Sequence, residues 1–161
     1  MQIICHAFPS WRGDYKKSTI ELMKELALRH SVLYIDYAYT LKDVLWNSLS
    51  NSFIPVKRIL GLKPALEVVK LPNGASMKVL SLPPLIPYQW ISHHRLFQVV
   101  QGINHFMINS RIRRVLRKEK IHQPVVVNAF NPLFSLATGE DKPKATLYYC
   151  YDQIDSCPWV S

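Results

Sequence analysis

The sequence predicts a single α/β domain of three layers, with a mostly parallel sheet and helices on both faces. Short apolar runs without alternating polar residues recur along the chain, as expected of parallel strands covered on both sides. The first two runs, Gln2–Phe8 and Ser31–Tyr37, enclose a segment with helical periodicity. Strand, helix and strand within about 35 residues form a βαβ unit with a right-handed crossover. We expect the first strand to lie in the centre of the sheet.

The segment Ser18–His30 is the first predicted helix. Its apolar residues fall at helical spacing, namely Ile20, Met23, Leu26, Ala27 and, as an option, Leu28. Ser18 followed by Glu21 has the pattern of a capping box, which predicts that the helix begins at Ser18.

The middle of the chain, between residues 40 and 82, is less regular. Thr40–Leu49 has the pattern of a short helix, and the prolines and glycine that follow, up to residue 66, favour a loop or a broken helix. Two apolar runs then flank Asn73-Gly74, which is a strong turn signal. We therefore expect a hairpin or strand pair from Leu66–Leu71 and Met77–Leu82.

The last part of the chain predicts a long helix from about Ser92 to Lys120, which Gly102 and Asn109 bend or split in two. Its expected apolar stripe consists of Leu96, Val99 or Val100, Ile103, Phe106 or Met107, Ile112, Val115 and Leu116. A buried strand, a short helix and a final buried strand follow at Gln123–Phe130, Asn131–Thr138 and Ala145–Tyr151.

Composition excludes several classes of protein. A chain of 161 residues with 48% hydrophobic residues is able to bury a core. No apolar run reaches the roughly 18 residues of a membrane helix, and the first residues lack the pattern of a signal peptide, so we expect a cytoplasmic protein. Cys5, Cys150 and Cys157 form an odd set without metal-type spacing, which favours buried thiols over disulfides or a zinc site.

The excess of 20 Lys and Arg over 11 Asp and Glu, a formal charge of +9, suggests an anionic partner. One basic cluster, at the end of the long predicted helix, comprises Arg111, Arg113, Arg114, Arg117, Lys118 and Lys120. This cluster also suits an anionic membrane surface, with Arg113 and Arg117 as membrane-facing residues. It is equally compatible with a solvated helix end that complements the helix dipole.

A second cluster, Lys57, Arg58 and Lys63, surrounds four residues that are mostly apolar. This composition suits docking onto an anionic membrane surface, with Ile59, Leu60, Leu62 and Trp46 as the side chains that enter the headgroup region. We expect no nucleic-acid partner, because neither an aromatic RNA-binding motif nor a helix-turn-helix pattern occurs.

Polar residues follow several predicted strands, and ligands of an open parallel sheet collect outside the carboxyl ends of its strands. The first loop, the loop of Asn128 and Asn131, and the loop of Asp152 should therefore line one crevice. In the first loop, Arg12 and Lys17 are candidates to hold a phosphate, assisted by backbone amides of the following helix.

Gly13 would let the backbone approach that phosphate. A single glycine differs from the G-x-G-x-x-G fingerprint, which argues against a nicotinamide cofactor. We expect no bound cofactor and no metal.

Four segments resemble the N-terminal domain of a GT-B glycosyltransferase, of the group used by bacteria for exopolysaccharide, capsule and teichuronic-acid-like polymers. They are Phe8–Ser18, Val32–Asp36, Val126–Pro132 and Leu147–Asp155. The resemblance implies a Rossmann-like domain over residues 1–161 that serves the acceptor side. It also implies a nucleotide-sugar donor and a glycan or lipid-linked acceptor at the inner face of the cell membrane.

The same resemblance implies a second, donor-binding domain, which these 161 residues do not contain. Because the last predicted strand runs into a loop rich in polar residues with nothing after it, we expect the first half of a two-domain hexosyltransferase. On this expectation the 161-residue chain alone transfers no sugar.

Sugar transfer to a hydroxyl requires an oriented acceptor and a carboxylate or imidazole that accepts a proton or stabilises an oxocarbenium-like state. Asp152 and Asp155 are the candidate catalytic residues, and Asp14 is the alternative, which an ion pair with Arg12 would also explain. Asp is common in turns, so a cap or surface pair remains open for each. His6, within the first strand, has the pattern of a packed core histidine.

Two other classes of function remain open. The first is a complete, non-catalytic binding domain of flavodoxin-like shape, although a receiver domain is disfavoured because His6, Ala7 and Phe8 stand where its acidic cluster would lie. The second is a basic nucleic-acid adaptor, which predicts a steep salt dependence of duplex binding.

Overall fold

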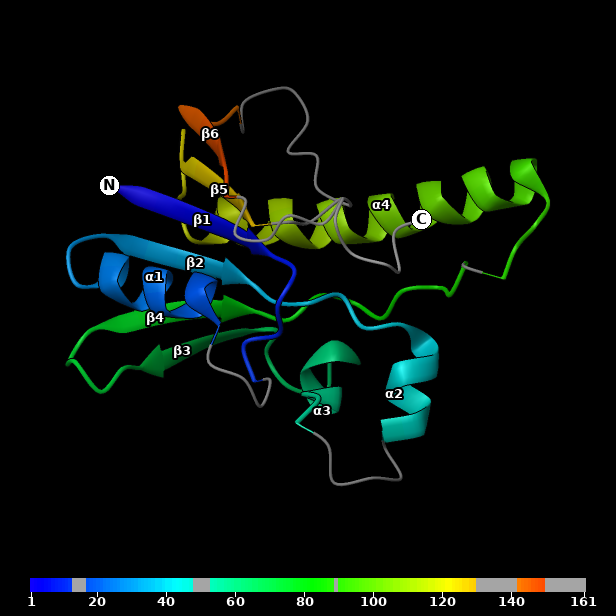
Figure 1. Cartoon of the computed structure of the whole chain (residues 1–161), viewed down its shortest axis with the longest axis horizontal. Helices are drawn as coiled ribbons and strands as arrows, with labels where there is room; N and C mark the ends of the chain where they lie inside the picture. Colours follow the sequence, from blue (N-terminus) through cyan, green and yellow to red (C-terminus); the bar gives the residue numbers. More distant parts are fainter. Residues whose placement is uncertain (13–16, 48–52, 89, 130–141, 150–161) are drawn as a thin grey trace.

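One sheet with the strand order β3-β4-β2-β1-β5-β6 organises the described part of the computed structural model, which covers residues 1–12, 17–47, 53–88, 90–129 and 142–149 (Figure 1). The strands are β1 (Gln2–Ala7), β2 (Ser31–Ile35), β3 (Leu66–Lys70), β4 (Ser76–Leu80), β5 (Val125–Ala129) and β6 (Ala145–Tyr148). The helices are α1 (Ser18–Ala27), α2 (Leu41–Asn47), α3 (Val56–Ile59) and α4 (His94–Lys118). This arrangement confirms the predicted mostly parallel α/β class.

Strand β1 is internal, as predicted, and pairs in parallel with β2 on one side and β5 on the other. Strands β4 and β6 extend the sheet in parallel at the next positions outward. The antiparallel pair is β3 with β4, which confirms the predicted hairpin. Gly74 in its turn has a φ of +83°, a conformation that glycine adopts without the penalty that a Cβ imposes.

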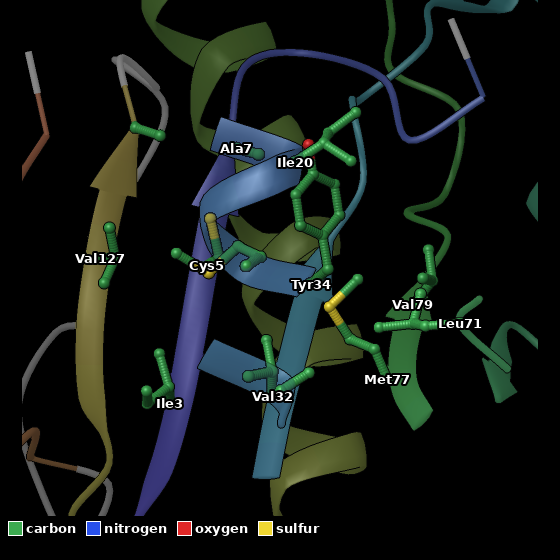
Figure 2. Packing of buried hydrophobic residues seen from close by; sticks show 13 residues of the cluster. Ile3, Cys5, Ala7, Ile20, Val32, Tyr34, Leu71, Met77, Val79 and Val127 are labelled. Carbon is green, nitrogen blue, oxygen red and sulfur yellow. The ribbon is translucent and has the colours of Figure 1, made fainter. Parts of the chain in front are cut away.

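The two faces of the sheet carry separate buried clusters. On one face Ile3, Cys5 and Ala7 of β1 pack beneath α1, together with Tyr34 of β2 (Figure 2). On the other face Ile4 of β1 packs with residues of β2, β4, β5 and α4, including Leu33, Leu80, Val126, Ile108, Ile112 and Leu116. Alternation along β1 thus sends neighbouring side chains to opposite helices, which places helices on both faces as predicted.

Helix α1 begins at the predicted residue but by a different cap. Lys17 is the N-cap, its carbonyl accepts hydrogen bonds from the amides of Ile20 (2.9 Å) and Glu21 (3.2 Å), and it makes no side-chain cap bond. The predicted capping box is wrong because Ser18 is already helical. The Glu21 carboxylate instead pairs with the Lys24 ammonium one turn later (2.8 Å).

Helix α4 is one continuous helix of 25 residues, so Gly102 and Asn109 neither break nor split it. The first half of the predicted apolar stripe is wrong at Leu96, Ile103 and Phe106, which are exposed. Of the predicted alternatives Val99 and Val100, Val99 is exposed and Val100 is buried. The buried residues are Val100, Asn104, Ile108, Ile112, Val115 and Leu116. In Figure 1 the early part of α4 runs past the tips of the strands, so no described strand lies beside it.

Strand β6 is an edge strand with exposed side chains, among them Leu147 and Tyr148. The prediction of a buried final strand is therefore wrong over Ala145–Tyr148, since among the described strands β6 has a neighbour on one side only. The predicted helix Asn131–Thr138 lies outside the described residues.

Candidate functional site

The loops that leave the carboxyl ends of β1, β2 and β4 lie together at one edge of the sheet. Asp36, the residue after β2, is 2% exposed and joins two of these loops. Its Oδ1 atom accepts hydrogen bonds from the backbone amides of Trp11 (2.8 Å) and Tyr37 (2.9 Å). Burial raises the pKa of Asp36, while those two bonds and the nearby Arg12 act in the opposite direction. Asp36 therefore positions the loop that carries Arg12.

Two tyrosines hold the same loop. The Tyr34 hydroxyl donates to the carbonyl of Pro9 (2.7 Å), and the Tyr39 hydroxyl donates to the Ser10 hydroxyl (2.7 Å). The Trp11 ring contacts the Tyr34 ring edge-on at a centroid distance of 5.4 Å. Sequence reasoning did not single out these positions, although an Asp directly after an apolar strand is a usable signal for a residue at this edge.

Aromatic rings line this edge beside the loop. Phe8 contacts Tyr37 edge-on at a centroid distance of 5.6 Å, and Tyr37 contacts Tyr39 at 5.1 Å. Phe8 is exposed and the two tyrosines are half-buried. Desolvation raises the pKa of both tyrosines, so their hydroxyls stay protonated at neutral pH. Such rings offer apolar faces with polar rims, which suits the packing of a sugar ring.

The predicted phosphate ligand Arg12 pairs with Glu67 of β3. Its Nη2 atom lies 2.5 Å from Glu67 Oε2, and Arg58 Nε lies 3.2 Å from the same oxygen. Arg58 Nη1 also donates to the carbonyl of Pro64 (2.6 Å). Glu67 was not among the predicted site residues, because nothing local marks a strand glutamate as the partner of an arginine 55 residues earlier.

These contacts revise the predicted membrane segment. Arg58 is held against Glu67 and Pro64 instead of being freely solvated, and Ile59 is buried in α3. The prediction that Ile59 enters lipid headgroups is therefore wrong, since its side chain packs inward. Leu60, Leu62 and Trp46 are exposed, as the prediction requires.

A pocket of about 500 Å³ lies between α3 and the start of β3. Its lining consists of Arg12, Lys57, Arg58, Lys63 and Glu67 together with Ile54, Pro55 and Val56. Glu67 stands opposite Val79 of β4, next to the last residue of that strand, so the pocket lies at the carboxyl edge of the sheet. The structure thus unites Arg12, predicted for substrate, with three basic residues predicted for a membrane. We call this the basic pocket.

Other predicted site residues lie elsewhere. Asn128 is on β5, opposite His6 of β1, and its carbonyl accepts a hydrogen bond from the Tyr149 amide (2.8 Å). The structure does not bring Asn128 to Arg12, because Arg12 reaches toward β3 at the far side of the sheet. Lys17 caps α1. The predicted residues outside the described part are Gly13, Asp14, Asn131, Asp152 and Asp155.

The basic end of α4 forms a second, smaller hollow of about 310 Å³. Arg113 and Arg117 line it with Arg114 and the exposed ring of Phe106. Both arginines are exposed, which fits a solvated helix end as well as a surface that meets an anionic partner.

Two titratable groups of β1 belong to the core. His6 is 1% exposed, and burial lowers its pKa to about 3. Burial also raises the pKa of the Cys5 thiol to about 12, so it stays protonated. The described residues contain no group of three His, Cys, Asp or Glu that could hold a metal ion. They also contain no helix with the length and apolar character needed to cross a membrane.

Comparison with known proteins found no matching family model, no matching curated protein and no matching solved structure.

Proposed function

We propose that this chain is the acceptor-side domain of a GT-B-type hexosyltransferase, which moves a sugar from a nucleotide-sugar donor to a polysaccharide or lipid-linked acceptor. One observation carries the proposal: aromatic rings and the basic pocket occur together at the carboxyl edge of a mostly parallel sheet. Sugar rings pack against aromatic faces, and phosphate groups bind Arg and Lys, so this edge has both chemistries that a phosphate-linked glycan requires.

In this proposal the described residues bind and orient the acceptor. Phe8, Tyr37 and Tyr39 receive the sugar ring, and Arg12 and Arg58 receive its phosphate. Asp36 acts as a positioning residue, because its buried carboxylate already accepts two backbone hydrogen bonds. The proposed catalytic carboxylates remain Asp152 and Asp155, and Asn128 and Asn131 remain proposed substrate residues.

The proposal assigns donor recognition to the second domain that the family resemblance implies. The 161-residue chain should therefore bind nucleotide sugars weakly and transfer no sugar by itself. The alternative, a non-catalytic flavodoxin-like binding domain, differs because its ligand site would be complete in this chain.

A titration followed by NMR distinguishes these possibilities. Its probes are a hexosyl diphosphate linked to a short isoprenyl chain, as acceptor analogue, and a panel of nucleotide sugars. We expect the acceptor analogue to shift resonances of Phe8, Trp11 and Tyr39 and to bind at least about tenfold more tightly than any nucleotide sugar. Tight nucleotide-sugar binding, or an acceptor analogue that leaves these resonances unmoved, contradicts the proposal.

Binding of the domain to the membrane surface is part of the same proposal. A lipid-linked acceptor requires the domain to approach an anionic membrane face, and α4 offers exposed apolar side chains that continue into exposed arginines. Leu96, Val99, Ile103 and Phe106 recur at spacings of three and four residues along one side of α4. The sequence already predicts Arg113 and Arg117 as membrane-facing residues, and in this proposal the exposed apolar side chains of α4 replace Ile59 as the groups that enter the headgroup region.

A further inference from the structure

We propose that the basic pocket is a binding site for a phosphate or diphosphate group. Its position differs from the phosphate site expected at the start of α1, because Arg12 turns toward α3 and β3 to meet Glu67. Four basic side chains and one carboxylate line the pocket, so its walls carry a net charge of three positive units before any ligand enters.

The two arginines are held in place before a ligand arrives. Both guanidinium groups contact the same oxygen of Glu67, and Arg58 is also fixed to the Pro64 carbonyl. A guanidinium carries five N–H donors, and the contacts of Arg58 use its Nε and Nη1 atoms, so donors remain for a ligand. Fixed arginines bind phosphate oxygens with less loss of side-chain entropy than free ones.

Partial burial strengthens the attraction. The side chains of Arg58 and Glu67 are 20% and 25% exposed, so their charges are screened less than charges on an open surface. Arg12, at 38%, is more open to solvent. Lys57 and Lys63 are exposed at the same pocket and can close on an anion from the solvent side. The lysines supply positive charge on flexible side chains, and the arginines supply hydrogen bonds of fixed direction.

The shape of the site selects the class of ligand. A cavity of about 500 Å³ lies within the usual range for small-molecule sites and exceeds the size of a lone phosphate, so a body attached to the phosphate fits as well. Ile54, Pro55 and Val56 provide an apolar wall for that body. No aromatic side chain is among the described lining residues, which disfavours single-stranded nucleic acid, since its bases need rings for stacking.

Glu67 has a double effect on binding. Its carboxylate aligns the two guanidinium groups, and its negative charge repels an incoming phosphate. A glutamine keeps a carbonyl oxygen for the arginines but removes the charge. Glu67→Gln should therefore tighten phosphate binding, whereas loss of a basic residue should weaken it.

The group that enters this pocket is, in our assignment, the phosphate of the glycosyl acceptor. That assignment rests on the proposed function, whereas anion binding by the pocket does not. Inorganic pyrophosphate tests the pocket, and the isoprenyl-linked hexosyl diphosphate tests the acceptor.

Calorimetric titration of the 161-residue chain with inorganic pyrophosphate, at fixed ionic strength, tests the proposal. We expect Arg58→Gln to weaken binding about tenfold or more, since a hydrogen bond between charged groups is lost. Glu67→Gln should tighten binding about threefold or more. The double variant Lys57→Gln, Lys63→Gln changes two exposed side chains and should also weaken pyrophosphate binding. It replaces Arg58→Gln as the test if that variant does not fold.

Arg29→Gln and Lys70→Gln are the matched controls. Both residues are exposed and lie away from the pocket, Arg29 beyond the end of α1 and Lys70 at the last residue of β3. Each control lowers the net charge by one unit, as Arg58→Gln does. Each should leave the affinity for pyrophosphate within about twofold of the value for the original chain. Equal losses in controls and pocket variants, or no binding of pyrophosphate to the unmodified chain, overturn the proposal.

Vesicles of phosphatidylglycerol, which carry a diester without a terminal phosphate, separate the two sources of phosphate chemistry. If the pocket variants lose vesicle binding and keep pyrophosphate binding, the residues belong to a membrane surface and the proposal is wrong. If pyrophosphate and the isoprenyl-linked hexosyl diphosphate bind equally well, the basic pocket is still a phosphate site, but the assignment of its ligand to the glycosyl acceptor is wrong.

Discussion

The backbone amide of Trp11 donates a 2.8 Å hydrogen bond to Oδ1 of Asp36, a residue 25 positions later in the chain. This bond connects the end of β2 to the loop after β1. Because the next residue in that loop is Arg12, the position of the basic pocket depends on a buried carboxylate that does not itself line it.

Replacement of Asp36 should destabilise the protein. Asp36→Ala leaves the Trp11 and Tyr37 amides without their acceptor, which should cost about 1–3 kcal/mol in the free energy of unfolding. Asp36→Asn retains an acceptor oxygen and should cost less. Urea denaturation measures both, and an alanine variant as stable as the original chain would show that the loop is held by other contacts.

The pH dependence of this effect follows from the raised pKa of Asp36. Above the pKa of the unfolded chain, the folded state retains the proton more strongly, so the contribution of Asp36 to stability declines as pH rises toward the folded pKa. Asp36→Asn does not titrate. Its stability relative to the original chain should therefore improve between pH 4 and neutral pH, and a relative decline over that range would contradict the assigned direction.

His6 should make the protein sensitive to acid. Its pKa falls from 6.5 to about 3 on burial, so the unfolded chain binds a proton that the folded chain does not. Stability from this group is complete above pH 6.5 and declines by about 1.4 kcal/mol per pH unit as pH drops below that value. We expect His6→Gln to remove this component of the slope, measured by denaturation between pH 4 and 7. His122→Gln, a change at an exposed histidine, is the control and should retain it.

Asn104 should be required for the attachment of α4 to the segment after β4. Its buried side chain accepts a hydrogen bond from the Ile86 amide and donates one to the Ile86 carbonyl, both at 2.9 Å. Asn104→Leu removes both bonds and should cost at least about 2 kcal/mol in unfolding free energy. Gln98→Ala, at an exposed position of the same helix, should change stability by less than about 0.5 kcal/mol. Similar effects of the two substitutions would refute this role for Asn104.

Gly102→Ala should stabilise the protein. Gly102 lies within α4, and a Cβ built there has no atom within 4 Å. Alanine favours the helix by up to about 1 kcal/mol because the unfolded chain loses conformational freedom. Thermal and urea unfolding should both show the gain. A loss of stability would mean that a methyl group at this position meets a contact absent from the described residues.

The exposed side of α4 should direct binding to anionic vesicles. Sedimentation with vesicles should increase with the fraction of anionic lipid and decrease with added salt. Phe106→Ser combined with Arg113→Gln and Arg117→Gln should weaken binding more than the change of Lys57, Arg58 and Lys63 to Gln. Binding that does not depend on lipid charge, or that persists in the α4 variant, would show that these arginines form an ordinary solvated helix end without a role at the membrane.

Local patterns in the sequence determined the βαβ start, the internal position of β1 and the hairpin at Gly74. Each depends on neighbouring residues: a continuous apolar run, a helical repeat, or a turn that tolerates positive φ. The family resemblance rests on such segments as well, and it stays a prediction for experiment.

Only the tertiary structure decided which face of α4 is buried and which residues surround Arg12. The helix has apolar residues on two sides, and the contact with the sheet selects Ile108 and Ile112 while it leaves Ile103 and Phe106 in solvent. Arg12, Arg58 and Glu67 come from three separate segments, and no local pattern pairs them. They meet because parallel strands bring their carboxyl ends to one edge of the sheet and the antiparallel return of β3 places Glu67 there.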